Sequence, residues 1–236
     1  MGNIEKKILG FWEEFIDHGA YRDFLDGIHN TLIIAILGLI IGTVIGTLIA
    51  AARVVPKYKI MPRILNGICS VYVSFFRGTP MVVQLLLFYY VLFPMMGVNI
   101  GSVSVAVLVF GLNSGAYISE IMRGGILSVD PGQMEGGRAM GMSFSATMMK
   151  IVIPQAVKNI LPTMGNEFIT LIKETSIVSF VGAMDLYMVF NKIGTNNYEF
   201  MVPYLAMALV YIVLVMLITL LIKVMERRLR KSDRGM

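Results

Sequence analysis

Charged residues are scarce in this chain. Only 15% of its 236 residues are Asp, Glu, Lys or Arg, whereas 56% are hydrophobic. Soluble domains carry about 25% charged residues, so this composition is typical of an integral membrane protein. The single cysteine, Cys69, excludes an intramolecular disulfide. The composition therefore excludes a soluble domain and a disulfide framework.

Motifs for nucleotide, metal and covalent chemistry are also missing. No glycine-rich loop followed by Lys and Ser or Thr occurs, so we expect the chain not to bind ATP itself. Its two histidines, His18 and His29, form no cluster with the spacing of metal ligands. No Ser-His-Asp arrangement supports an enzyme. The sequence therefore predicts no catalytic site, no metal and no cofactor in this chain.

Long apolar runs dominate what is present. A hydrocarbon core of ~30 Å requires about 20 apolar residues in a helix. Five runs meet this length, although charged residues interrupt the fourth. The chain is therefore predicted to be an all-α membrane protein with five transmembrane helices, at 29–52, 64–97, 102–122, 163–190 and 200–224.

Two local patterns refine these spans. Residues 64–97 are too long for one straight helix, and the run Arg77-Gly78-Thr79-Pro80 predicts a break after a helix over 61–76. Proline lacks an N–H, and glycine relaxes the backbone. Arg77 would then lie near the membrane interface or pair with a carboxylate. Glycines at 38, 42 and 46 share one helix face, which predicts close helix packing.

Basic residues mark one side of the membrane. They are concentrated in 53–63, 123–162 and 223–236, and cytoplasmic loops carry such an excess. We therefore expect the N-terminus outside and the C-terminus in the cytoplasm, with a basic cytoplasmic tail over 227–236. This placement of the charges argues against nucleic-acid binding, despite a net charge of +5.

The first 28 residues differ from the rest. They hold six acids against three bases, and no short apolar core with a small-residue cleavage site follows, so a cleavable signal peptide is not expected. Phe11, Trp12, Phe15 and Phe24 are interspersed among the acids. Such a pattern predicts an amphipathic extracytoplasmic segment over 1–28, because Trp and Phe favour the membrane interface.

The connection between the third and fourth spans, about 123–162, is too long to be structureless. Asp130-Pro131 predicts a helix start, and Gly141 predicts its end in a left-handed conformation. Ser143 can cap a second helix, which is expected to end at Pro154. The result is a compact cytoplasmic projection, whose small residues Gly136, Gly137 and Ala139 admit another backbone. Alternatively, this helical hairpin only covers the end of the bundle.

This loop resembles the EAA loop found in membrane subunits of ABC importers. The shared pattern is Glu135-Gly136-Gly137, three residues, Gly141, nine residues, Ile151, one residue, and Ile153-Pro154. The usual form has two alanines at 136 and 137, and commonly Leu at 153. The segments FFRGTPMVVQ, GAYISEIMRGGI and IVIPQAVKNILPTMGNEFITLIKETSIVS are also similar to polar amino-acid permeases of that family. The resemblance covers roughly residues 27–228.

The resemblance implies the importer fold, with transport and ATP hydrolysis carried out by different subunits. A transmembrane domain over 29–226 would move a polar amino acid, and separate cytoplasmic ATPase subunits would bind ATP and Mg. An extracytoplasmic solute-binding protein would deliver the substrate, and the permease would form a homodimer or a heterodimer in a bacterial-type cytoplasmic membrane. The loop would insert into the ATPase as a coupling helix, through Glu135, Gly136, Gly137, Gly141, Met142 and Ser143.

The resemblance also implies a substrate path. Ionisable residues within spans are functional candidates, and the cluster of Glu174, Thr175 and Ser176 resembles the segment that lines the amino-acid pocket in the family. A structural hydrogen bond or ion pair for Glu174 is equally compatible with the sequence. Asp185 is expected at the outer boundary, and Glu120 is expected to pair with Arg123 three residues later. The remaining candidates for the path are Phe88, Asn113, Tyr117, Ser119 and Ser176.

Two other functions remain open. The same architecture could import another small solute, such as an opine or an organosulfur amino acid. An ion-coupled secondary transporter belongs to a different class, but we find no internal inverted repeat of the kind that many such transporters show.

Overall fold

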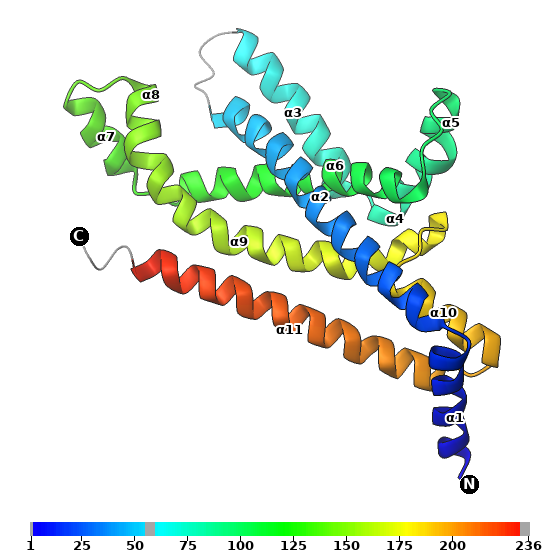
Figure 1. Cartoon of the computed structure of the whole chain (residues 1–236). Coiled ribbons are helices and arrows are strands. Elements are labelled where there is room, and N and C mark those ends of the chain that lie inside the picture. Colours follow the sequence, from blue (N-terminus) through cyan, green and yellow to red (C-terminus); the bar gives the residue numbers. More distant parts are fainter. Residues whose placement is uncertain (1, 55–59, 232–236) are drawn as a thin grey trace. The chain divides into compact units, whose positions relative to one another are not determined.

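The computed structural model describes residues 2–54 and 60–231, and within these ranges it is nearly all helical, without a strand (Figure 1). Lys57 and Lys59 of the predicted basic loop and the end of the predicted basic tail, 232–236, lie outside the described residues. The α-helices are α1 Asn3–Trp12, α2 Ala20–Val54, α3 Ile60–Gly78, α4 Met81–Leu87, α5 Phe93–Met95, α6 Ser102–Leu127, α7 Pro131–Ala139, α8 Phe144–Thr147, α9 Ile153–Glu174, α10 Leu186–Asn197 and α11 Met201–Lys231. Short π segments are η1 Glu13–Asp17, η2 Phe88–Leu92 and η3 Met148–Val152, and η4 Thr175–Val181 is a 3₁₀ helix.

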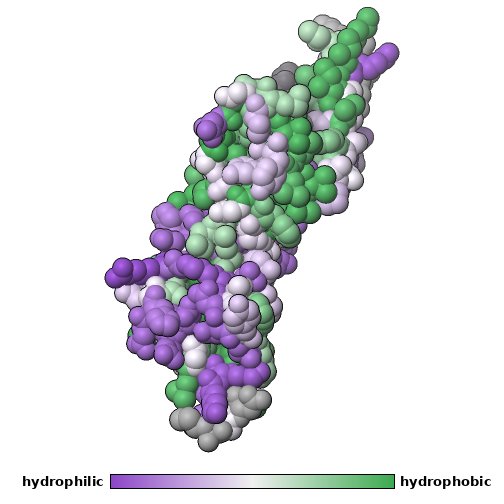
Figure 2. Space-filling view, turned by 90° about the vertical axis from the view of Figure 1, so that its right-hand side faces the viewer, coloured by the Kyte–Doolittle hydropathy of each residue, from purple (hydrophilic) through white to green (hydrophobic). Residues whose placement is uncertain are grey.

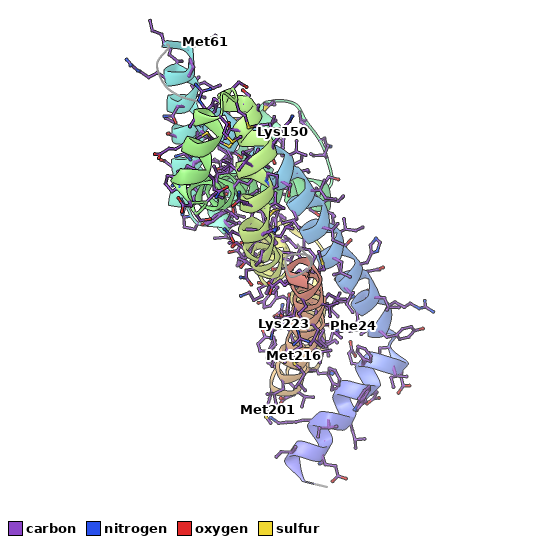
Figure 3. The ribbon with its side chains drawn as sticks, turned by 90° about the vertical axis from the view of Figure 1, so that its left-hand side faces the viewer. Phe24, Met61, Lys150, Met201, Met216 and Lys223 are labelled. Carbon is purple, nitrogen blue, oxygen red and sulfur yellow. The ribbon has the colours of Figure 1, made fainter. Side chains whose placement is uncertain are left out.

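Three of the described helices, α2, α6 and α11, are each long and apolar enough to cross a membrane. Two bent pairs, α3 with α4–α5 and α8–η4 with α10, raise this number to five if each pair is one span. Wide apolar areas reach the surface in Figure 2, and the labelled Met201 and Met216 of α11 in Figure 3 are 47% and 58% exposed. A large exposed apolar surface is what a lipid-facing protein requires, so the chain is a multi-pass membrane protein.

The predicted break at 77–80 is confirmed. α3 ends at Gly78, and α4 begins at Met81 after Pro80, whose backbone is extended. Proline suits this position because a helix start needs no N–H from the residue before it.

Contacts divide the chain into two units. Unit 1 consists of Met1–Gly38, Pro80–Phe110 and Ile169–Ile218. Unit 2 consists of Leu39–Thr79, Gly111–Phe168 and Thr219–Met236. Each unit has its own buried cluster of apolar side chains.

The apolar cluster of unit 1 centres on α10. Its buried members Leu186, Val189, Phe190 and Ile193 pack with Phe11 of α1. Phe15 and Phe24 are packed against the same cluster. The three phenylalanines predicted to face the membrane interface therefore point into unit 1, and only Trp12 of the four predicted aromatic residues is largely exposed, at 50%.

Close helix packing in unit 2 depends on glycines from two helices. A Cβ on Gly42 or Gly46 of α2 would lie 2.7 Å from Ser114 or Ile118 of α6. In return, Gly111 and Gly115 of α6 lie against Ile41 and Ile45 of α2, with similarly short distances. The predicted packing role of Gly42 and Gly46 is confirmed.

The expected end of a helix at Pro154 is wrong. α8, η3 and α9 follow one another without a break from Phe144 to Glu174, and Pro154 occupies the second position of α9. The N–H of Ile153 bonds to the carbonyl of Met148, five residues back. This π segment widens the turn directly before Pro154, so the ring does not meet the carbonyl that would end a regular helix.

Candidate coupling loop and substrate path

Local caps fix the helical projection between α6 and α9. The Asp130 carboxylate accepts a hydrogen bond of 2.7 Å from the N–H of Gly132, and Pro131 occupies the first position of α7. Gly141 ends the turn after α7 with φ of 83°. The Ser143 hydroxyl then accepts a hydrogen bond of 3.2 Å from the N–H of Ala146. These caps are the predicted ones, and they are confirmed.

The two glycines of the EAA-like pattern have different surroundings. Gly137 is buried, and a Cβ added there would lie 2.5 Å from Thr147 and 3.2 Å from Ile151. Gly136 is exposed, with nothing within 4 Å of an added Cβ. Gly137 therefore allows α7 to pack on α8 and η3, whereas Gly136 lies beside the exposed Glu135 on the free side of the projection.

Side-chain bonds hold the projection to its base. Arg138 donates a bond of 2.8 Å to the carbonyl of Met142, which stabilises the turn at Gly141. Gln155 of α9 donates to Gln133 of α7 at 3.1 Å. Val129, Val152, Ala156 and Ile160 form the apolar cluster beneath. Caps, side-chain bonds and packing together make the projection a firm body rather than a loose loop.

A paired carboxylate lies at the same end of unit 2. Glu120 accepts bonds of 3.0 and 2.7 Å from Arg123, as predicted, and it also pairs with Arg53 of α2. The two partners share the two carboxylate oxygens. Sequence reasoning missed Arg53, because it is separated from Glu120 by 67 residues and no helical spacing relates them.

Asn113, Tyr117 and Ser119 of the predicted path belong to unit 2. The structure places the first two beside α3. The amide of buried Asn113 donates to the carbonyl of Phe76 at 3.3 Å. The guanidinium of Arg77 lies 5.4 Å from the centre of the Tyr117 ring, a cation–π contact that neither predicted environment of Arg77 included. Ser119 is fully buried, and its hydroxyl bonds to the carbonyl of Ala116 in its own helix.

The other three predicted path residues belong to unit 1. Glu174 is the last residue of α9 and is partly buried. Ser176 donates to the carbonyl of Lys173 at 3.2 Å, and both line a cavity of about 530 Å³ with Tyr187 and Tyr211. Phe88 begins η2, and η2 is joined to η4 by the hydroxyl of Tyr90, which donates to the carbonyl of Phe180 at 3.3 Å.

Two other ionisable residues of the fourth predicted span have structural partners. Asp185 is fully buried and accepts bonds from the N–H groups of Tyr187 and Met188, at 3.2 and 2.9 Å, as the N-cap of α10. Glu167 accepts a bond of 3.0 Å from Ser114. Both carboxylates therefore have hydrogen-bond partners within the fold.

Comparison with known proteins places this helical, multi-pass membrane protein in the class of membrane transport components. Residues 42–231 match the family model described as the binding-protein-dependent transport system inner membrane component. The chain belongs to this family.

Relatives with assigned functions are similar over most of the chain. The arginine transport system permease protein ArtQ of Bacillus subtilis is 40% identical over 70% of this chain and 76% of its own length. The L-cystine transport system permease protein TcyB of the same organism is 40% identical over 86% of this chain and 85% of its own. A crystal structure of an amino acid ABC transporter with histidines matches with a TM-score of 0.81 and 38% identity, covering 88% of this chain and 94% of that chain.

Proposed function

We propose that this chain is the permease subunit of an ABC importer that carries a polar amino acid across the cytoplasmic membrane. The observation that carries the proposal is the family match together with the amino-acid permeases that are 40% identical to the chain. The 38% identical amino acid ABC transporter structure adds support at the level of the fold. ATP and Mg would be bound by a separate ATPase subunit, and this chain would hold no cofactor or metal of its own.

The loop provides the mechanical contact in this proposal. A projection can transmit force only if it does not deform. The close packing of Gly137 and the Gln133–Gln155 bond hold α7 to the helices that follow it, and the Asp130 and Ser143 caps fix the starts of α7 and α8. Its exposed residues Glu135 and Gly136 would contact the ATPase, with Gly141, Met142 and Ser143 forming the adjoining turn. Closure of two ATPases would then move two such projections together and switch the access of the permease.

The substrate path would contain Glu174. A carboxylate at the end of α9 favours the amino or cationic group of an amino acid, because an opposite charge within a poorly solvated environment is strongly stabilised. In unit 1, Ser176 and Phe88 would belong to the path with Glu174. In unit 2, Asn113 and Tyr117 are proposed for the path on the family resemblance alone, whereas the internally bonded Ser119 would support α6. Glu174→Gln should weaken uptake about tenfold, the equivalent of about 1.4 kcal/mol, with Glu167→Gln as the matched carboxylate control. Unchanged uptake with normal assembly would remove Glu174 from the path.

The proposal also assigns the two ends of the chain to opposite sides of the membrane. The amphipathic segment 1–28 would lie outside and the tail 227–236 in the cytoplasm, around a transmembrane domain over 29–226. The permease would work as a homodimer or heterodimer with a solute-binding protein outside. The deciding experiment is uptake into liposomes that contain the permease, its ATPase and its binding protein. Uptake should require ATP on the side of the liposome membrane that the ATPase faces. Uptake that an ion gradient drives without ATP would instead identify a secondary transporter.

An organosulfur amino acid is the second candidate substrate. The cystine permease TcyB matches over 86% of this chain, a larger share than the arginine permease ArtQ. Thermal-shift screening of the cognate binding protein with arginine, glutamine and cystine separates these candidates. A ligand raises the free energy of unfolding with the logarithm of the ratio of its free concentration to its Kd, so the ligand that binds most tightly gives the largest shift at equal concentration.

A further inference from the structure

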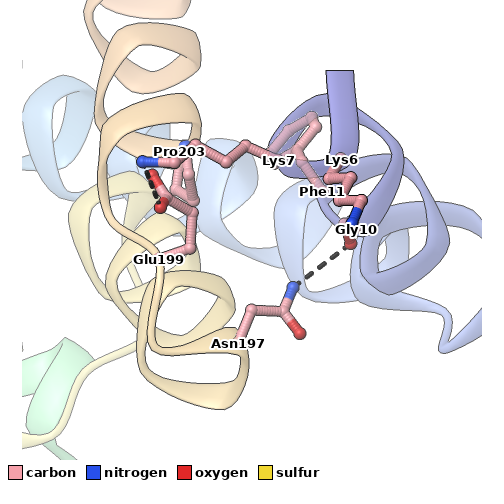
Figure 4. Close-up of a pocket in the computed structure, with 7 residues that line it drawn as sticks. All are labelled: Lys6, Lys7, Gly10, Phe11, Asn197, Glu199 and Pro203. Carbon is pink, nitrogen blue, oxygen red and sulfur yellow. Dashed lines mark hydrogen bonds and ion pairs between the residues drawn. The ribbon is translucent and has the colours of Figure 1, made fainter. Parts of the chain in front are cut away.

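The N-terminal helix α1 is bound to the turn between α10 and α11, and we call the contacts that bind it the latch. The ammonium of Lys7 lies 2.7 Å from the carboxylate of Glu199, and the amide of Asn197 donates to the carbonyl of Gly10 at 3.2 Å (Figure 4). One turn later, Asn196 donates to the buried carboxylate of Glu14. These contacts bind one face of the α1–η1 segment within unit 1, beside a cavity of about 280 Å³ that is lined by Lys6, Lys7, Gly10, Phe11, Asn197, Glu199 and Pro203.

A second face of the same segment is apolar and open. Ile4, Ile8, Trp12 and Ile16 follow one another at intervals of four residues, and their exposed fractions are 60%, 43%, 50% and 57%. Residues four apart lie on one side of a helix. The four side chains therefore form a continuous stripe, which we call the outer stripe. Polar residues Lys6, Glu13 and Asp17 are exposed elsewhere on the segment, and exposed Glu5, three residues before Ile8, borders the stripe.

The latch places the outer stripe beside the ends of two apolar helices. α2 begins at Ala20, three residues after η1 ends, and α11 begins at Met201, two residues after Glu199. Both helices are long and apolar enough to cross a membrane. The segment that carries the outer stripe is thus followed by one helix able to cross a membrane and bound next to the start of another.

The aromatic residues at this level agree with a lipid boundary. Trp12 lies on the outer stripe, and Tyr198, between the latch residues Asn197 and Glu199, is 91% exposed. Tyr198 has φ of 50°, a position that glycine or asparagine usually occupies at a helix end. Trp and Tyr are enriched where a membrane meets water, because they combine an apolar ring with a polar group.

We propose that α1–η1 is an interfacial helix whose outer stripe is covered by phospholipid of the outer leaflet, while its opposite face is latched to the α10–α11 turn. The helix thereby ties the start of α11 and the end of α10 to the membrane surface. This role concerns the membrane and is independent of which solute is carried.

The only tryptophan of the chain makes the proposal directly testable. The full chain in nanodiscs is compared in ordinary phosphatidylcholine and in phosphatidylcholine brominated on its acyl chains. Bromine quenches indole emission on contact, so Trp12 should lose most of its emission in the brominated lipid, and iodide in the water should quench it little. Emission that brominated lipid leaves unchanged and iodide quenches would overturn the proposal.

Matched variants separate lipid contact from loss of structure. Trp12→Phe with Lys6→Trp moves the only indole to the polar side of α1, and the quenching pattern should reverse. With Trp12 retained, Ile8→Asp should lower the quenching by brominated lipid, whereas Lys6→Asp should not. If the solute-binding protein shields Trp12 from iodide while brominated lipid has no effect, the stripe binds that protein, and the proposal is wrong.

Discussion

The candidate coupling loop in unit 2 and the N-terminal latch in unit 1 are both short helical segments, but the residues that their hydrogen bonds join lie at different separations along the chain. In the loop, each cap joins residues two or three positions apart, as between Asp130 and Gly132 or Ser143 and Ala146. In the latch, Gly10 and Asn197 are separated by 187 residues. The loop forms its shape largely from local sequence, whereas the latch forms only after the chain has brought distant helices together. The two regions should therefore respond differently to mutation.

The largest effect is expected where a long-range contact is partly buried. Glu120→Gln would leave Arg53 and Arg123 without their shared carboxylate, and their side chains are only 17% and 38% exposed. Breaking a buried pair by removing one partner costs about 3 kcal/mol, so the melting temperature of the purified chain should fall markedly.

Arg123→Gln is the control for this change, because Arg53 would still neutralise Glu120. Its effect should be smaller than that of Glu120→Gln. Equal effects of the two variants would contradict the shared-carboxylate arrangement.

The same contrast between local and long-range contacts explains which features could be predicted from the sequence. Asp130, Gly141 and Ser143 were predicted correctly because a cap depends on residues within one turn. The four-residue spacing likewise predicted the packing glycines Gly42 and Gly46, and Gly78 and Pro80 predicted the break before Met81. Arg53 could not be assigned to Glu120, and the phenylalanines of the first 28 residues were given the wrong environment, because both depend on contacts across the fold. Pro154 was misjudged because a π segment relieves a clash that a regular helix could not avoid.

The next largest effect is expected within the loop, at Gly137. Gly137→Ala should destabilise the loop, because its Cβ would meet Thr147 at 2.5 Å. Overpacking costs about 1–3 kcal/mol, against about 1 kcal/mol gained from helix propensity. Gly136→Ala has open space and should be neutral or stabilising by up to about 1 kcal/mol. Thermal unfolding and binding of the ATPase subunit measure both variants.

A compensating change tests the reason for this difference. Thr147→Ser removes the methyl group nearest to the added Cβ, so it should restore part of the stability of Gly137→Ala. If Gly136→Ala and Gly137→Ala behave alike, the two glycines do not have the separate roles assigned to them.

A smaller effect is expected for the ion pair of the latch. The side chains of Lys7 and Glu199 are 30% and 23% exposed, and ion pairs that water reaches contribute little to stability. Lys7→Glu should therefore loosen α1 and increase hydrogen exchange of its amides, with little change in the rest of the chain. The combination Lys7→Glu with Glu199→Lys restores opposite charges and should recover protection. If the double variant is as loose as Lys7→Glu alone, the ion pair does not hold α1.

The smallest effect is a pH dependence that only the latch should show. The bonds from Asn196 and His18 lower the pKa of Glu14 below its ordinary value of 4.5, and the Glu14 carboxylate raises the pKa of His18 above its ordinary value of 6.5. Because the pKa of His18 is raised on folding, its stabilisation is fully present below pH 6.5 and is lost as the pH rises through the folded-state pKa. Because the pKa of Glu14 is lowered, its stabilisation is present above pH 4.5 and is lost as the pH falls through its folded-state pKa.

The latch should therefore be tightest between about pH 4.5 and 6.5, the ordinary values of the two groups. Lys192 also attracts Glu14, while Glu13 and Asp17 favour protonated His18, so these neighbours widen the window on both sides. Hydrogen exchange of the α1 amides, corrected for the intrinsic effect of pH, should be slowest in that range. His18→Gln should remove the loss of protection on the alkaline side and leave the acid side in place, because Asn196 still bonds to Glu14. The coupling-loop amides provide the internal reference: their caps contain no histidine, and a parallel alkaline loss of protection there would show that the whole fold, rather than the latch, responds to pH.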